Sequence, residues 1–119
     1  MAAVRFKLNI QSSTVTTDKL DFMVDKNVTV ALPYGGVNRM SIATATATLL
    51  TGATHAQSML YVRNLDPTNF VELSETGGTV LAKISAGLFC LIPVAANSVP
   101  ELQADTAACT VEVGIWALP

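Results

Sequence analysis

Residues 58–92 constrain the fold more than any other part of the chain, because four short β-forming runs follow one another there. β-branched, aromatic and long aliphatic side chains dominate these runs, as is typical of strands. The runs span residues 59–63, 69–73, 79–84 and 88–92. Pro67 lies between the first two runs and Gly77-Gly78 between the next two, where a fixed φ and a positive φ favour turns. Short strands joined by tight turns predict an antiparallel all-β fold.

Strict alternation of apolar and polar residues predicts a strand near each end of the chain. Residues 4–10 alternate without exception, and residues 109–116 do so again. Because successive side chains of a strand point to opposite faces, each segment is expected to bury one face. The expected inward residues are Val4, Phe6, Leu8, Ile10, Cys109, Val111, Val113 and Ile115.

Three further stretches are expected to contribute strands. Residues 20–24 and 28–32 are interpreted as two strands separated by a polar turn at 25–27. Residues 41–51 alternate alanine with threonine, and threonine disfavours a helix, so a strand with one alanine face and one threonine face is expected. Residues 99–103 are expected near a sheet edge, because Pro100 cannot donate to a central ladder.

The pattern as a whole is nine or ten strands with turn residues every 8–12 positions and no convincing helix. A sandwich, a jelly roll and a small barrel share this pattern. We expect a single-domain, antiparallel, jelly-roll-like β-sandwich over residues 1–119. The expected core consists of Phe6, Leu8, Leu60, Val62, Leu81, Phe89, Leu91, Val111 and Val113.

Charge is unevenly distributed along the chain, which indicates an interface. Residues 1–26 carry seven of the 16 charged side chains, whereas residues 27–60 carry only Arg39. A solvated surface normally carries interspersed charge, so this stretch is either unusually buried or faces a partner. Threonine hydroxyls can meet partner backbone without the desolvation cost of charges, and alanines allow close approach. The candidate interface residues are Arg39, Thr44, Thr46, Thr48 and His55.

Composition argues against several classes of partner and chemistry. The net charge of −2 and the absence of a Lys/Arg cluster give no footprint for nucleic acid. No apolar run reaches the ~18 residues of a membrane-spanning helix, and the first residues lack a signal-peptide pattern, so a cytoplasmic origin is expected. Cys90 and Cys109 are expected as small buried hydrophobes, although a bridge between neighbouring strands stays an alternative.

The sequence contains no recognisable catalytic or metal-binding pattern. His55 has no second histidine or carboxylate nearby, and a solvated loop position is expected for it. Asp18, Asp21 and Asp25 lack the glycine and terminal glutamate of a calcium loop and are interpreted as a charged edge. No Gly-x-Ser-x-Gly elbow occurs. We therefore expect no enzyme, no catalytic residue, no cofactor and no metal.

Three segments in the second half of the chain carry a resemblance to a known class. They are residues 61–73, with Asn64 before a turn and Thr68-Asn69-Phe70-Val71 after it, residues 83–87, with a glycine turn, and residues 103–108, with Ala104-Asp105-Thr106-Ala107. This series of turns resembles small virion structural proteins of tailed bacteriophages. The resemblance covers residues 61–116, whereas residues 1–57 match no pattern.

The resemblance implies a capsid decoration or cement protein on the outside of a phage head. It implies the major capsid protein as partner, a homo-oligomer with a trimer favoured, and assembly in the host cytoplasm, with no site residues to carry over. A tail or head-completion protein is the alternative. A jelly-roll module for carbohydrate ranks last, because only Tyr34, Tyr61 and Trp116 could serve as aromatic platforms.

Overall fold

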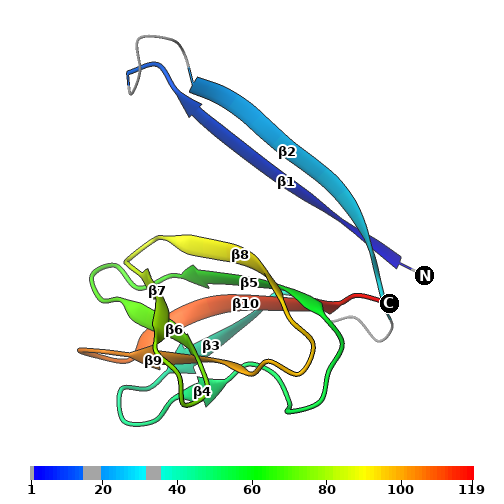
Figure 1. Ribbon diagram of the computed structural model, residues 1–119. Coiled ribbons are helices and arrows are strands. Elements are labelled where there is room, and N and C mark those ends of the chain that lie inside the picture. Colours follow the sequence, from blue (N-terminus) through cyan, green and yellow to red (C-terminus); the bar gives the residue numbers. More distant parts are fainter. Residues whose placement is uncertain (1, 15–19, 32–35) are drawn as a thin grey trace.

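A computed structural model of the protein describes residues 2–14, 20–31 and 36–119 (Figure 1). These residues form ten strands and no helix, so the predicted all-β class is confirmed. None of them belongs to a helix long and apolar enough to cross a membrane. Asp18 and Tyr34 lie outside the described residues.

Eight strands form a β-sandwich of two antiparallel sheets. The first sheet has the order β3 (Asn38–Ile42), β10 (Cys109–Ala117), β5 (Ser58–Asn64) and β8 (Phe89–Val94). The second has the order β4 (Thr48–Leu49), β9 (Pro100–Ala104), β6 (Val71–Glu75) and β7 (Val80–Ile84). The pairing is nested, since β3 pairs with β10, β4 with β9, β5 with β8 and β6 with β7. Eight strands nested in this way over two sheets form a jelly roll, as predicted.

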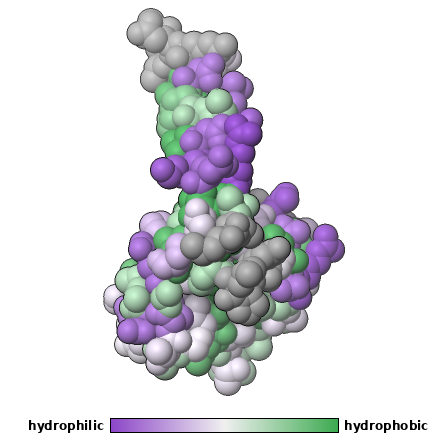
Figure 2. All heavy atoms as spheres, turned by 90° about the vertical axis from the view of Figure 1, so that its right-hand side faces the viewer, coloured by the Kyte–Doolittle hydropathy of each residue, from purple (hydrophilic) through white to green (hydrophobic). Residues whose placement is uncertain are grey.

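The other two strands, β1 (Ala2–Ser12) and β2 (Leu20–Val30), form a long hairpin outside the sandwich. They pair with each other over all eleven residues, from Ala2 opposite Val30 to Ser12 opposite Leu20. Figure 1 shows this hairpin rising from the end of β10 and diverging from the first sheet toward its tip. In Figure 2 it stands out as a column with hydrophobic atoms along one side and hydrophilic atoms along another. We call residues 2–12 and 20–30 the arm.

The core lies between the two sheets and is built by the inward residues of each strand. Of the predicted core, Leu60, Val62, Val111 and Val113 are buried there, which confirms these four. Side chains that alternate along a strand bury one face only, so each sheet contributes every second residue. The buried apolar cluster consists of Ile42, Leu60, Val62, Val71, Leu73, Ile84, Val94, Leu102, Ala104, Cys109, Val111 and Val113.

Four residues of the predicted core are exposed, and these predictions are wrong. Leu81 is 70% exposed because it points outward from β7. Phe89 and Leu91 lie on the outer face of the first sheet, and Leu8 lies on the arm. Phe6 is half-buried and lies outside the sandwich core. The apolar runs around Leu81, Phe89 and Leu91 do not alternate, so the sequence does not indicate which of their faces points inward, and Leu8 alternates as predicted but lies on the arm.

Three predicted strands differ in the structure. Residues 20–30 form one strand without a turn at 25–27, because pairing with β1 holds the polar residues in the ladder. Residues 43–47 form no strand, since the chain crosses there from the first sheet to the second. The predicted alanine and threonine faces therefore do not exist. Pro100 begins β9, an interior strand, where it leaves the ladder intact as a first residue.

Candidate functional site: an apolar groove beneath the arm

The five predicted interface residues do not gather in one place. Arg39 is exposed on β3, and its Nε lies 4.0 Å from Oε2 of Glu112 on β10. Thr44 and Thr46 are exposed in the β3–β4 connection, where the Thr44 carbonyl accepts a hydrogen bond from Gln103. Thr48 is half-buried and lies opposite Leu102 of β9. An interface through these residues stays a prediction.

His55 joins two loops through hydrogen bonds, so the predicted freely solvated position is wrong. Its backbone N–H donates to Oδ1 of Asn97 at 3.0 Å. Its ring nitrogens lie 2.7 Å from the carbonyl oxygen of Ala56 and 2.5 Å from that of Ser98. The side chain is half-buried, and it ties the loop after β4 to the connection before β9. We therefore assign it a structural role.

A groove of about 790 Å³ lies between the arm and the first sheet. One wall is the face of the arm that carries Val4, Phe6 and Leu8, and the other is the outer face of the sheet. The sheet wall is formed by Tyr61, Phe89, Leu91, Glu112 and Trp116, among others. Both walls of the groove are therefore mainly apolar, and the charged residues that line it are Arg5, Lys7 and Glu112.

The apolar face of the arm becomes more exposed toward its tip. The ladder places Leu8 opposite Val24 and Ile10 opposite Phe22 on the face that also carries Phe6. These four side chains are 38–53% exposed. Large apolar side chains that lie together in water are the usual mark of a surface that binds a partner.

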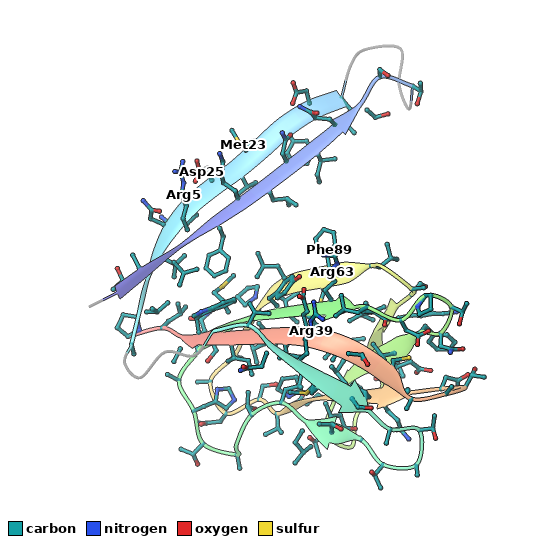
Figure 3. The ribbon with its side chains drawn as sticks, turned by 180° about the vertical axis from the view of Figure 1, so that it is seen from behind. Arg5, Met23, Asp25, Arg39, Arg63 and Phe89 are labelled. Atoms are coloured by element: carbon teal, nitrogen blue, oxygen red, sulfur yellow. The ribbon has the colours of Figure 1, made fainter. Side chains whose placement is uncertain are left out.

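The opposite face of the arm is polar. Arg5 pairs with Asp25 across the hairpin, with 2.7 Å from Nε to Oδ1, and this contact lowers the pKa of Asp25. Gln11 donates to Asp21 at 3.3 Å nearer the tip. Figure 3 shows Arg5, Met23 and Asp25 on the side of the arm away from the sandwich, whereas Phe89 points from β8 toward the arm. The arm therefore has one polar face and one apolar face.

The base of the arm is joined to the sandwich by two contacts, beside which Val30 is buried. Val30 is fully buried, and the Ala31 N–H donates to the carbonyl oxygen of Ala117 at 2.8 Å. The rings of Phe6 and Trp116 meet edge to face, with centroids 5.6 Å apart and planes at 74°. These contacts position the first half of the arm, and no comparable contact anchors Leu8, Ile10, Phe22 or Val24 among the described residues.

Gly114 makes room for the Trp116 ring, a role that the sequence analysis missed. A Cβ added at Gly114 would lie 2.5 Å from Cη2 of Trp116. The indole therefore lies across the backbone of its own strand, where a residue larger than glycine would push it away. A glycine inside a strand often marks such a close approach, so Gly114 within residues 109–116 was an available signal.

On the sheet wall, Glu112 holds together the polar groups beside the groove. The Tyr61 hydroxyl donates to Oε1 of Glu112 at 3.1 Å, and Arg39 approaches the other oxygen. Burial and this carboxylate raise the pKa of Tyr61, which keeps the phenol neutral. The wall therefore carries a polar rim of Tyr61, Glu112 and Arg39 beside Phe89 and Leu91, with Arg63 opposite Phe89 on the same face.

The two cysteines are unbridged and serve as packing residues. Cys109 is fully buried, and Cys90 packs against the same core. Burial raises the pKa of both thiols, which disfavours the reactive thiolate. In the described part of the chain, no three His, Cys, Asp or Glu side chains come together in a way that could hold a metal ion.

The turn that carries the phage resemblance is built on a buried asparagine. Nδ2 of Asn64 donates to the carbonyl oxygens of Asn69 and Ile84 at 2.8 and 3.0 Å. Its Oδ1 accepts from the N–H of Asp66 at 2.9 Å, and Asp66 in turn accepts from the N–H groups of Thr68 and Asn69. These hydrogen bonds fix the β5–β6 connection, which gives the motif a structural role.

Comparison with known proteins does not identify a family for this chain. No family model, no curated protein and no solved structure matches the chain.

Proposed function

We propose that the protein is a virion structural protein of a tailed bacteriophage, a decoration protein that binds the outside of the head shell and stabilises it. The observation that carries this proposal is the arm, whose apolar face remains exposed beside an apolar sheet face. Such a pair of surfaces suits a protein that works in an assembly, because each becomes stable when a partner covers it. The resemblance of residues 61–116 to phage virion proteins supplies the kind of assembly.

A decoration protein stabilises a shell by binding to the assembled state only, which shifts the equilibrium against disassembly. The charge-poor β3–β4 connection is the candidate contact with the major capsid protein. Thr44 and Thr46 are exposed there, and residues 43–47 carry no charge. Hydroxyl and backbone groups can pair with a partner without the desolvation cost of buried ions.

Binding to heads that lack the protein tests this function. The Thr44→Lys, Thr46→Lys double variant is expected to bind heads at least about tenfold more weakly, because it buries unpaired charge at the contact. The isolated variant is expected to melt normally, since both positions are exposed. Heads without the protein are expected to keep their shape but to lose the genome at lower temperature. Co-sedimentation and thermal release of the genome measure the two effects.

The matched control places lysines at Ala95 and Ala96, which are also exposed. This connection follows β8 at the opposite end of β10 from the β3–β4 connection. The control variant is expected to bind heads normally. Equal binding by both double variants would exclude the β3–β4 connection as the contact. Heads that neither bind the wild-type protein nor lose stability without it would exclude the decoration role and leave a tail or head-completion protein as the alternative.

A carbohydrate-binding role has one observation in its favour, since Tyr61 and Trp116 both line the groove. However, Trp116 lies over Gly114 and meets Phe6, so its ring is already engaged by the protein. Trp116 is the single tryptophan of the chain, which makes its fluorescence a direct probe. A saturable change in this fluorescence with an oligosaccharide would favour the sugar-binding alternative, and we expect none.

A further inference from the structure

We propose that the arm of each copy docks on the outer face of the first sheet of a second copy, so that assembly proceeds by arm exchange. The donor surface is the apolar face with Leu8, Ile10, Phe22 and Val24, and the acceptor surface lies around Phe89 and Leu91. This inference describes how copies of the protein on a shell would join one another. Its biological role therefore rests on the proposed decoration function.

Donor and acceptor surfaces match in chemistry. Phe22 and Val24 are 47% and 53% exposed on the arm, and Phe89 and Leu91 are 57% and 37% exposed on β8. The acceptor face carries Tyr61 and Glu112 as a hydrogen-bonded rim beside these apolar side chains. An aromatic and aliphatic centre with a polar rim is the usual composition of a protein interface.

The arm does not close on the sheet of its own chain. Its base is held by the Ala31–Ala117 hydrogen bond and by the contact of Phe6 with Trp116, beside buried Val30. Its ladder runs without a register shift from base to tip, so no bulge is present at which the tip could bend down. Figure 1 shows the tip diverging from β8. The sheet of another copy can approach the exposed face without any change in this geometry.

The size of the arm favours a second copy over an unrelated partner. The four donor side chains are 38–53% exposed, and at roughly 150–250 Å² of full accessible surface each they present an apolar surface of roughly 350 Å². One arm docked on a foreign surface then buries roughly 700 Å² in total, below the ~1,200 Å² at which stable interfaces begin. Reciprocal docking of two arms buries roughly 1,400 Å², which lies inside the range of stable interfaces. In a closed ring, every copy likewise gives one arm and receives another.

Sedimentation of the purified full chain tests the exchange. The wild type is expected to sediment at micromolar concentration as a closed multiple of 12.5 kDa. Val24→Glu places a carboxylate in the docked face, and we expect it to weaken self-association at least about 100-fold. Met23→Glu is the matched control, because Met23 is 55% exposed on the opposite face, and its effect is expected to stay within about threefold.

A second pair of variants tests the acceptor surface. Phe89→Asp is expected to weaken self-association as strongly as Val24→Glu does. Leu81→Asp is its control, because Leu81 is also exposed but points outward from the other sheet. Mixing the Val24→Glu and Phe89→Asp proteins is expected to give a weak complex that neither protein forms alone, because the intact arm of the Phe89→Asp protein can dock on the intact sheet of the Val24→Glu protein. Exchange between copies predicts this rescue, whereas closure within one chain predicts none.

The possible outcomes separate this inference from the proposed function. A wild type that sediments at 12.5 kDa, or an oligomer that Val24→Glu and Met23→Glu weaken equally, overturns arm exchange. A monomer whose binding to heads is lost on Val24→Glu assigns the arm to the shell, which overturns the exchange but keeps the decoration role. If mixing the two variants restores association as predicted but the oligomer binds no heads, arm exchange stands and the decoration role is overturned.

Discussion

The sandwich and the arm are built from the same sequence pattern and differ in what covers their apolar faces. In β5, Leu60 and Val62 alternate with polar or outward residues and are buried by the opposite sheet. In β1, Leu8 and Ile10 alternate as strictly, yet both are 38% exposed. Alternation therefore determines which side chains share a face, whereas only the tertiary arrangement determines whether that face is covered.

This difference separates stability from assembly. The buried clusters of the sandwich hold the domain together, so substitutions there lower the free energy of unfolding. The arm contributes little to that core, and an isolated two-stranded hairpin is at best marginally stable in water. Substitutions in the arm are therefore expected to change association more than unfolding.

The largest effect is expected for Asn64→Ala, which breaks the turn after β5. The variant leaves the carbonyl groups of Asn69 and Ile84 without their donor and the Asp66 N–H without its acceptor. Three unsatisfied groups at ~1–3 kcal/mol each give about 3–9 kcal/mol, and a loss of roughly 3–5 kcal/mol is expected because the Asn69 and Asp66 groups are only partly buried. Asn9→Ala, on the exposed polar face of the arm, is the control and is expected to change stability by less than ~0.5 kcal/mol. Urea unfolding measures both, and similar losses would contradict the assignment.

A matched pair of leucine substitutions compares the two regions directly. Leu60 is 1% exposed in the sandwich, so Leu60→Ala is expected to cost ~2–5 kcal/mol through lost burial and a cavity. Leu8 is 38% exposed on the arm, so Leu8→Ala is expected to cost less than ~1 kcal/mol in unfolding of the monomer. Thermal melting in the dissociated state measures this difference. If Leu8→Ala were as damaging as Leu60→Ala, the arm would belong to the core.

The smallest effect concerns pH and two aspartates. Backbone N–H groups of Asn69 and Thr68 lower the pKa of Asp66, and Arg5 lowers that of Asp25. A folded pKa below the ordinary value near 3.8 gives stability that is present above pH 3.8 and lost as pH falls through the folded pKa. Asp66→Asn keeps an acceptor but does not titrate, so it is expected to flatten the decline in unfolding stability below pH 4.

Asp25→Asn is the control for this measurement, because Asp25 lies on the arm. It is expected to flatten the acid limb of the unfolding stability less than Asp66→Asn does, because Arg5 and Asp25 form an exposed pair that solvent screens. Urea midpoints are measured from neutral to acidic pH. The difference between each variant and the wild type at the same pH cancels the contribution of the other carboxylates. If the acid limb responded to Asp25→Asn but not to Asp66→Asn, the Arg5–Asp25 pair would be the main source of the acid sensitivity, which would contradict this prediction.

The sequence was sufficient for the fold class and most strands. The runs in 58–92 and 109–116 correspond to β5 to β8 and β10, because large apolar residues gather there with turn residues between the runs. It failed at residues 43–47, where alternating alanine and threonine gave the pattern of a strand without large side chains to bury. It also divided β2, because Lys26, opposite Phe6 on the apolar face, gave the appearance of a turn.

The groove could not be predicted from the sequence. Its walls combine β1, β8 and the end of β10, which are distant in the chain and meet only through the jelly-roll connections. The predicted interface instead followed the lack of charge in residues 27–60, which the structure divides among a sheet face, a crossing connection and a loop held by His55. The low charge of residues 27–60 predicts either burial or a partner, and it does not predict which surface a partner would meet.

Hydrogen exchange of the backbone amides in the arm tests the central claim most directly, because it measures what covers the arm. Exchange is compared between the assembled wild type and the Val24→Glu monomer, with the amides of β5 and β10 as internal reference. We predict that amides of residues 2–12 and 20–30 are protected in the assembly and exchange rapidly in the monomer, while the reference amides stay protected in both. Equal protection of the arm in both states would contradict the account, because the arm would then need no second copy to be stable.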